Sequence, residues 1–251
     1  MAKKPLKIVL LVPFSSDDPS RIKIWEHVSK WLQTTLDYPL FIGDYGPENT
    51  DQYNHSLARN WAAQRAGDWD VAVFHDADTV LNPQLIQAGV KIAAESGALT
   101  YPYNERWELD FEGTKMLLEN ETSNWQAHMR NYTYTRPLGG CMIIRRDLWD
   151  DIRGFDTGFV GWGHEDGAFA IACEKISGKT LIRIPGKSLH LEHVFAPGKH
   201  RESPIYHKNK ERINRYLAAM RQPNATEHLR ALRDESIKID TAAGINWLAR
   251  E

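Results

Sequence analysis

Residues 70–78 read Asp-Val-Ala-Val-Phe-His-Asp-Ala-Asp, an apolar run that leads into two aspartates separated by one residue. A continuous run of β-branched and aromatic residues is typical of a strand buried on both faces of a parallel sheet. Alternate side chains of an extended chain point the same way, so Asp76 and Asp78 can face one cation. Carboxylates suit Mn²⁺ or Mg²⁺ together with phosphate oxygens. The stretch therefore predicts a metal–diphosphate site at the end of a buried strand; the alternative is a solvated turn or a helix cap before Pro83.

Segments of similar character precede and follow this strand. Ile8–Val12 is a second buried strand that ends at Pro13, and residues 40–42 are a third. Helical periodicity covers residues 21–36 and 54–66, and another helix begins at Asn82-Pro83. Strands that alternate with helices predict an α/β fold with a mainly parallel, Rossmann-like sheet flanked by helices. Because such sheets bind ligands beyond the carboxyl ends of their strands, residues 13–21 and 76–78 are expected at the binding edge.

The second half of the chain is less regular. The pattern weakens over residues 105–136, which predicts a variable loop or irregular helices on the acceptor side. Strands are expected at 139–144 and 180–184, with a helix at 165–177 that ends at Gly178. Beyond Pro204 the composition becomes charged, and two amphipathic helices follow. We therefore expect one domain over residues 1–203 and a C-terminal helical extension over 204–251.

Composition excludes several classes of function. The 251 residues carry a formal net charge of -2, which disfavours a general nucleic-acid or anionic-membrane binder. Two cysteines do not make a disulfide framework. No apolar run resembles a signal peptide or reaches membrane length. These features predict a cytoplasmic protein with no membrane partner.

Two histidines follow the late strand, in the order His190-Leu-Glu-His193. Imidazole is a good ligand for Mn²⁺, and two histidines three positions apart can meet at one ion in a turn. An isolated pair of this kind is more often structural. With the two aspartates upstream, the pair instead indicates a shared metal site, in which His193 is the stronger candidate.

Gly161-Trp-Gly-His-Glu-Asp166 combines flexible backbone with an indole and two acids. Glycines on both sides of Trp162 allow a mobile loop. Glu165 and Asp166 begin the next helix, where carboxylates are electrostatically favourable and capping alone could explain one of them. The functional interpretation is that one carboxylate acts as a general base, taking the proton from an acceptor hydroxyl.

Seven short motifs occur in an order that resembles one group of enzymes. They are Val12-Pro-Phe14, Tyr53-Asn54-His55, Phe74-His-Asp-Ala-Asp78, Pro137-Leu-Gly-Gly140, Gly154-Phe-Asp156, Gly161-Trp-Gly-His-Glu-Asp166 and His190-Leu-Glu-His193. The set resembles the GT-A-fold glycosyltransferases of the β-1,4-galactosyltransferase, chondroitin-polymerase and polypeptide N-acetylgalactosaminyltransferase group, over roughly residues 6–200. The resemblance implies a GT-A fold and transfer of a hexose or N-acetylhexosamine from a UDP-sugar to an acceptor hydroxyl of a glycan, a protein or another molecule, with Mn²⁺ or Mg²⁺ as cofactor.

The resemblance also implies roles for individual residues. The donor-binding set would be Pro13, Phe14, Arg21, Asn54, Asp76, Gly139, Gly140 and Trp162. The metal ligands would be Asp76, Asp78, His190 and His193, with His190 where the galactosyltransferases have a methionine. Glu165 would hold the acceptor sugar and Asp166 would be the base.

The chain departs from the group at three positions, of which the first two touch donor and acceptor contacts and leave the sugar specificity open. His164 replaces a glycine, Gly167 stands where a third acid often follows, and His55 replaces an arginine. Asp166, where other members have asparagine, favours inversion of the anomeric centre. The alternatives are a non-catalytic sugar-nucleotide or glycan-binding module, a sugar nucleotidyltransferase, or a transferase that modifies nucleic acid or protein. The nucleotidyltransferase is disfavoured because the chain lacks a glycine-rich basic loop near residue 13, and the basic residues near 199–215 fit a solvated helix face better than a nucleic-acid site.

Overall fold

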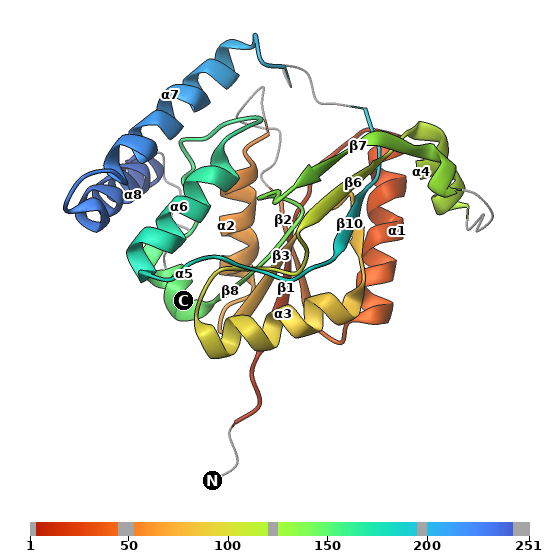
Figure 1. The fold of residues 1–251 in the computed structure, drawn as a ribbon, viewed down its shortest axis with the longest axis horizontal. Coiled ribbons are helices and arrows are strands. Elements are labelled where there is room, and N and C mark those ends of the chain that lie inside the picture. Colours follow the sequence, from red (N-terminus) through yellow and green to blue (C-terminus); the bar gives the residue numbers. More distant parts are fainter. Residues whose placement is uncertain (1–3, 45–52, 120–124, 195–199, 243–251) are drawn as a thin grey trace.

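A six-stranded sheet forms the centre of the computed structural model, which describes residues 4–44, 53–119, 125–194 and 200–242 (Figure 1). Its strands, in spatial order, are β2 (Leu40–Gly43), β1 (Ile8–Pro13), β3 (Val71–His75), β8 (Cys141–Arg145), β5 (Thr100–Tyr101) and β9 (Ile182–Arg183). The pairs β1–β2, β1–β3 and β5–β9 are parallel, whereas β8 is antiparallel to both of its neighbours. The α/β class and the mainly parallel pairing agree with the sequence prediction.

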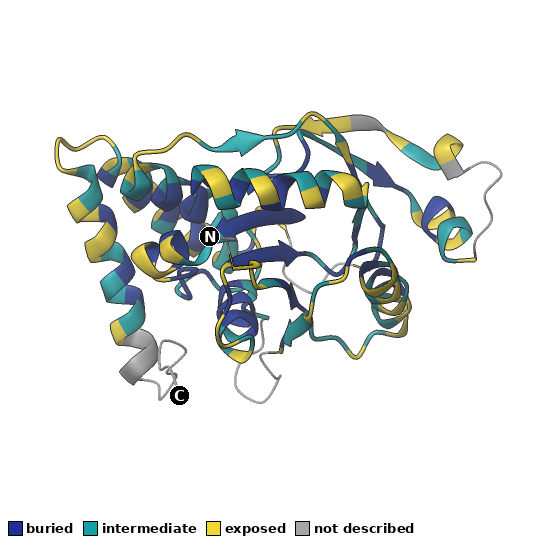
Figure 2. Cartoon of the chain, turned by 90° about the horizontal axis from the view of Figure 1, so that it is seen from below, coloured by how far each residue is buried: buried dark blue, intermediate teal, exposed yellow. Residues whose placement is uncertain are grey.

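Helices cover both faces of this sheet. One face packs against α1 (Pro19–Thr35) and α3 (Pro83–Ser96), through residues such as Val28 and Val90. The other face packs against α2 (His55–Arg65), α5 (Arg146–Ile152) and α6 (Glu165–Ser177), through residues such as Trp149 and Phe169. Strands β1, β3 and β8 between these layers are buried along nearly their whole length, and the helices are exposed on their outer sides (Figure 2). This two-sided burial explains why the strand sequences are continuously apolar.

Local sequence signals set where the helices begin. The side chain of Asp18 accepts hydrogen bonds from the backbone N–H groups of Ser20 and Arg21, with Pro19 at the first helical position. Asn82 and Pro83 begin α3 in the same way. Each cap satisfies N–H groups that have no partner inside the helix, and each proline occupies a position where no N–H is needed.

A second sheet forms where the sequence pattern was weakest. Its order is β4 (Thr79–Leu81), β10 (Lys187–His190), β6 (Glu105–Leu109) and β7 (Met129–Thr135), and α4 (Phe111–Leu118) and the 3₁₀ helix η1 (Trp125–His128) lie between β6 and β7. The prediction of a loop or irregular helices over residues 105–136 was therefore wrong for the two strands. The reason is that this sheet is small and half-exposed, so its strands mix charged and aromatic residues, and β6 is stabilised by pairing with β10, about eighty residues later.

The last two helices pack on α6. Ser203 caps α7 (Pro204–Ala219), and α8 (Ala225–Ala242) follows. Both lie beside α6, on the side of the molecule opposite α1 and α4 (Figure 1). A third apolar cluster joins these helices to α6 and to the chain before it: Phe159, Ala168, Ile213, Tyr216, Ala219 and Leu229. Across the described ranges, no helix has the length and apolar character needed to cross a membrane.

Candidate active site

A cavity of about 310 Å³ lies at the carboxyl ends of β1 and β3, beside the N-terminus of α6 and the end of β10. It is lined by ten of the residues selected from the sequence: Pro13, Arg21, Asp76, Asp78, Gly139, Trp162, Glu165, Asp166, His190 and His193. The structure thus brings together residues that are up to 180 positions apart, at the edge where α/β sheets bind ligands.

One face of the cavity has the chemistry of a cation site. Asp78, His190 and His193 place three ligand atoms within 4.8 Å of one another, and they are the one group of this kind among the described residues. His193 Nε2 is 3.0 Å and His190 Nε2 is 3.7 Å from Asp78 Oδ2. Two ligands of an ion bound at about 2.1 Å are about 3 Å apart when adjacent and about 4 Å apart when opposite. The spacing therefore fits a Mn²⁺-sized ion, and one carboxylate with two imidazoles suits that metal.

His190 also has a carboxylate behind it. Its Nδ1 lies 2.7 Å from Glu108 Oε2, while Nε2 faces Asp78. A carboxylate on the far nitrogen of a histidine fixes the ring and its tautomer, as around many protein-bound metals. Burial lowers the pKa of His190, but Asp78 and Glu108 outweigh burial and raise that pKa above its ordinary value.

Strand register determines which residues meet here. β4 begins directly after Asp78 and pairs antiparallel with β10, with Thr79 opposite His190. On the other side of β10, Glu108 of β6 is opposite the same histidine. A slip of one residue would turn His190 to the opposite face of the sheet. The second sheet thus delivers His190 and its carboxylate partner to the end of the central sheet.

The opposite face of the cavity carries two acids and a buried arginine. Arg59, from α2, is 2 % exposed. Its Nη1 lies 3.1 Å from Asp166 Oδ1 and 3.8 Å from Glu165 Oε1, and its Nη2 lies 3.0 Å from Asp76 Oδ1. One guanidinium therefore faces three carboxylates, which stabilises both the buried cation and the acids.

Asp76 lies outside the group of three residues that could hold a metal ion. Its Oδ1 accepts from Arg59 and its Oδ2 accepts from the backbone N–H of Gly140 at 3.0 Å. Burial raises the pKa of Asp76, but Arg59 outweighs burial, so that pKa lies below its usual range. Asp76 therefore binds Arg59 and the backbone of Gly140, whereas Asp78 faces the two histidines.

The electrostatics separate Asp166 from the other aspartates. Burial raises its pKa to about 8; Arg59 opposes this rise, and the neighbouring charges of Glu165 and Asp76 add to it. Burial raises the pKa of Glu165 as well. By contrast, His190 and His193 outweigh burial and hold the pKa of Asp78 far below its usual range. One side of the cavity thus holds a permanent anion, and the other holds an acid that titrates near neutral pH.

Gly139 leaves the room that Asp166 needs. A Cβ at this position would lie 2.6 Å from Asp166 Oδ2, closer than non-bonded atoms can approach. Any other residue at position 139 would displace the carboxylate. Gly139 was selected as a donor-binding residue, and in the structure the space at its missing side chain is filled by the Asp166 carboxylate.

Three residues selected from the sequence do not line the cavity. Phe14 packs on Trp25 with ring centroids 5.2 Å apart. Asn54 caps α2 by accepting from Leu57 N–H, and its amide donates to the carbonyl of Thr157. Gly140 acts through its N–H, as described above. Phe14 and Asn54 therefore contact other parts of the protein and do not line the cavity.

Sequence reasoning also missed polar residues that line the cavity: Arg59, Arg106, Glu108, Arg130 and Glu192. Arg130 forms an ion pair with Glu192, and Arg106 Nε lies 2.8 Å from Glu108 Oε1. The sequence signal for Arg59 was a charged residue among the apolar residues Leu57, Ala58 and Ala62 of the same helix. Three of the others, Arg106, Glu108 and Arg130, lie in the stretch predicted as irregular.

Comparison with known proteins shows a likeness to galactosyltransferases. The family described as the N-terminal domain of galactosyltransferase matches residues 121–195, which contain Gly139, the loop around Trp162, His190 and His193. Human β-1,4-galactosyltransferase 5 is 21% identical over 230 residues, covering 90% of this chain and 50% of the relative. The chain resembles the β-1,4-galactosyltransferases. Mouse β-1,4-galactosyltransferase 4 is 21% identical over 164 residues, covering 64% of this chain and 40% of that protein.

The chain spans about half the length of the galactosyltransferases it matches. Among solved structures, a Drosophila β-1,4-galactosyltransferase 7 mutant in complex with manganese, UDP-Gal and xylobiose has a TM-score of 0.49 at 19% identity, covering 81% of this chain and 74% of that one. GalNAc-T7 with UDP, GalNAc and Mn²⁺ has a TM-score of 0.48 at 13% identity, covering 96% and 58%.

Proposed function

We propose that the protein is a metal-dependent glycosyltransferase that transfers a hexose or N-acetylhexosamine from a UDP-sugar to an acceptor hydroxyl, with inversion. The observation that carries the proposal is the two-sided cavity: Asp78, His190 and His193 on one face, Glu165 and Asp166 on the other. The resemblance to the galactosyltransferases supports it, as do the manganese and UDP-sugar named for the Drosophila protein.

In this proposal Asp78, His190 and His193 hold a divalent cation, Mn²⁺ or Mg²⁺. When bound, the cation neutralises the charge of the donor diphosphate. Arg21 Nη1 lies 3.4 Å from His193 Nδ1, so a cationic side chain stands beside the same region. The donor's uridine would lie near Pro13 and Arg21, and its sugar would lie below Trp162.

Asp166 acts as the base. An acid with a pKa of about 8 accepts a proton far more readily than an ordinary aspartate, and general bases work best when their pKa is near the working pH. Asp166 takes the proton of the acceptor hydroxyl as that oxygen bonds to the anomeric carbon, and the bond from that carbon to the diphosphate oxygen breaks. Glu165 is placed to hold the acceptor sugar. Arg59 keeps Asp76, Glu165 and Asp166 in position.

Thermal unfolding with a panel of nucleotide sugars tests the proposal. UDP-sugars should raise the melting temperature in the presence of Mn²⁺ and not in its absence, and Asp78→Asn should remove the effect. At 100 times its dissociation constant a ligand adds about 2.7 kcal/mol, or roughly 5–10 °C for a chain of this size. Failure of every UDP-sugar to stabilise the protein with Mn²⁺ would overturn the proposal.

Turnover separates an enzyme from a binding module with the same cavity. A transferase releases UDP slowly from its donor when water replaces the acceptor, and this release should require Mn²⁺ and Asp166. Stabilisation by UDP-sugars without any UDP release would leave binding as the function and refute the catalytic proposal.

A further inference from the structure

The loop that carries Trp162 is held from behind by α7, a helix outside the matched family segment. Trp162 lines the cavity and is 38% exposed. The ring of Tyr206, in the first turns of α7, stacks on the indole with centroids 5.4 Å apart and planes inclined by 22°. The same tyrosine ring lies 5.0 Å from the ring of His164. One face of the indole is thus covered by α7.

Asn209, one turn further along α7, binds the backbone of the same loop. Its Nδ2 donates to the carbonyl of Val160 at 2.9 Å and to that of Trp162 at 3.2 Å. Between these carbonyls, the N–H of Gly161 donates to the carbonyl of Tyr53. Asn209 is 2 % exposed, so its amide would lose stabilisation if the loop moved away. Helix α7 therefore fixes both the backbone and the side chain at the tip.

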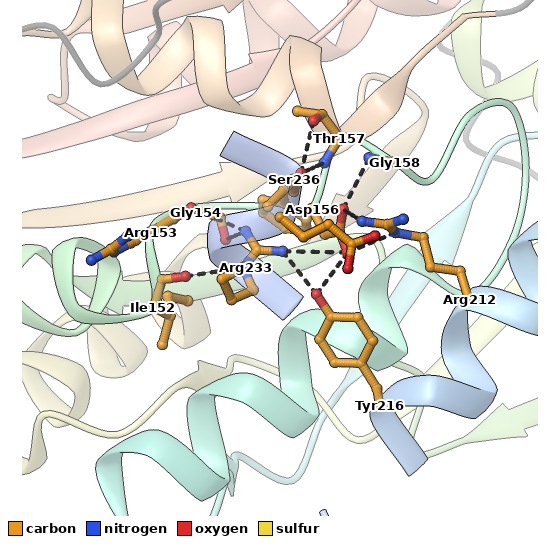
Figure 3. A network of polar contacts seen from close by, with 12 residues as sticks. Ile152, Arg153, Gly154, Asp156, Thr157, Gly158, Arg212, Tyr216, Arg233 and Ser236 are labelled. Carbon is orange, nitrogen blue, oxygen red and sulfur yellow. Dashed lines mark hydrogen bonds and ion pairs between the residues drawn. The ribbon is translucent and has the colours of Figure 1, made fainter. Parts of the chain in front are cut away.

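The base of the loop, from Asp156 to Gly158, also contacts α7. Arg212 of α7 makes two parallel contacts of 2.8 Å with the buried carboxylate of Asp156, which also accepts from Tyr216 Oη at 2.7 Å and from Gly158 N–H at 2.9 Å (Figure 3). Bidentate arginine–carboxylate pairs have a defined geometry and are among the stronger hydrogen-bonded contacts. Asp156, which precedes the Trp162 loop, is thus held in place by Arg212 and Tyr216 of α7.

Helix α8 braces this base from the other side. Arg233 donates from Nε to the carbonyl of Ile152 at 3.1 Å and from Nη2 to that of Arg153 at 3.0 Å, and Ser236 Oγ accepts from Thr157 N–H at 3.1 Å (Figure 3). Arg233 and Ser236 are both buried. With its base braced by two helices and Phe159 packed on Tyr216, the loop is held near Trp162 by Tyr206 and Asn209.

We propose that Tyr206 and Asn209 are positioning residues that hold Trp162 at the cavity before the donor arrives, so that donor capture does not require ordering of the loop. The functional half of this inference rests on the proposed transferase activity. Pre-organisation lowers the entropic cost of binding, so losing either contact should weaken donor capture more than it slows the chemical step.

The position of Trp162 can be measured without any substrate. The full-length protein is labelled with 5-fluorotryptophan, and its ¹⁹F resonance is assigned with Trp162→Phe. Tyr206→Ala and Asn209→Ala should move this resonance toward the position of a solvent-exposed indole. Tyr206→Phe, which keeps the stacked ring, and Asn214→Ala, an exposed asparagine on the same helix, should leave it in place. An unmoved resonance in both Tyr206→Ala and Asn209→Ala would overturn the positioning role.

Kinetics test the functional half, with Mn²⁺ and the UDP-sugar that stabilises the wild type most. Tyr206→Ala and Asn209→Ala should raise KM for the donor about 3- to 10-fold, with kcat changed less than about 2-fold and Tyr206→Phe restoring the wild-type value. An unchanged KM in a variant whose ¹⁹F resonance has moved would refute donor capture as the purpose of the contact. If the wild type turns over no UDP-sugar, the proposed function fails, whereas the ¹⁹F result still decides whether α7 positions Trp162.

Discussion

His193 Nε2 lies 3.0 Å from Asp78 Oδ2, although the two residues are 115 positions apart in the chain. Asp78 lies shortly after the end of β3 at His75, and His193 lies shortly after the end of β10 at His190. With His190 they form a compact oxygen–nitrogen site whose atoms are close enough to share one ion.

Loss of an imidazole should weaken metal binding directly. We expect His193→Ala to lower the affinity for Mn²⁺ by at least about 100-fold, because even partners that only orient a ligand contribute 10- to 100-fold. Titration of free Mn²⁺ by electron paramagnetic resonance measures this. His228→Ala, at an exposed histidine of α8, is the matched control and should bind as the wild type does. Equal affinities for the two variants would contradict the proposed ligand set.

Glu108 should act on the metal through His190. Glu108→Gln keeps the size of the side chain and removes its charge, so the Nδ1 contact of His190 weakens. We expect a 10- to 100-fold loss of Mn²⁺ affinity with the fold intact. Glu112→Gln, at an exposed glutamate on α4, should have no effect in the same titration. A result in which both glutamine variants match the wild type would show that Glu108 does not tune the site.

Asp166 should set the pH dependence of transfer. Because its pKa is raised to about 8, the carboxylate needed as base becomes fully populated only above that pH. The rate of UDP release from the donor should therefore rise with pH and level off above about 8. Asp166→Asn should reduce this rate by about 10²- to 10⁴-fold while UDP binding survives. Wild-type turnover in this variant would exclude Asp166 as the base.

The same shift has a consequence for stability. An aspartate ionises near pH 4 in an unfolded chain, so between about pH 4 and 8 the unfolded state releases a proton that the folded state keeps on Asp166. This group therefore contributes a loss of stability as pH rises across that range, and no further change above it. Asp166→Asn should remove the contribution. Urea unfolding of both proteins from pH 5 to 8 should show their difference growing in favour of the variant.

Arg59 should be the costliest single residue of the site. Arg59→Met leaves Asp76, Glu165 and Asp166 without their shared cation. Removing one partner of a buried ion pair costs about 3–5 kcal/mol, and we expect that loss in the free energy of unfolding. Arg65→Met, on the same helix, removes an exposed contact with the carbonyl of Ile42 and should cost about 1 kcal/mol. Equal losses for the two variants would contradict the role assigned to Arg59.

The central sheet could be predicted because its strands carry their own signal. β1 and β3 are buried on both faces, so their sequences are apolar throughout, and the helix caps at Asp18 and Asn82 are local. Asp78, Asp166 and His193 could be selected because each lies within about one turn of the end or the start of a recognisable element.

Arg59 and Glu108 could not be found in this way. Arg59 lies on the buried face of α2, and its charge is balanced by Asp76, Glu165 and Asp166, of which the last is 107 positions later. Glu108 belongs to a strand that forms by pairing with β10, about eighty residues later. Both depend on partners distant in the chain, which local periodicity does not detect.

Thr79, next to Asp78, pairs with His190, a residue that is synthesised much later. A growing polypeptide that has emerged only to residue 150 already contains Asp76 and Asp78 but neither His190 nor His193. With the proposed ligand set, a cation cannot nucleate the early steps of folding during synthesis, because His190 and His193 are made after all strands of the central sheet. Chelators present during translation should leave the first folded intermediates unaffected, and acquisition of Mn²⁺ then marks a chain that has been finished through residue 193.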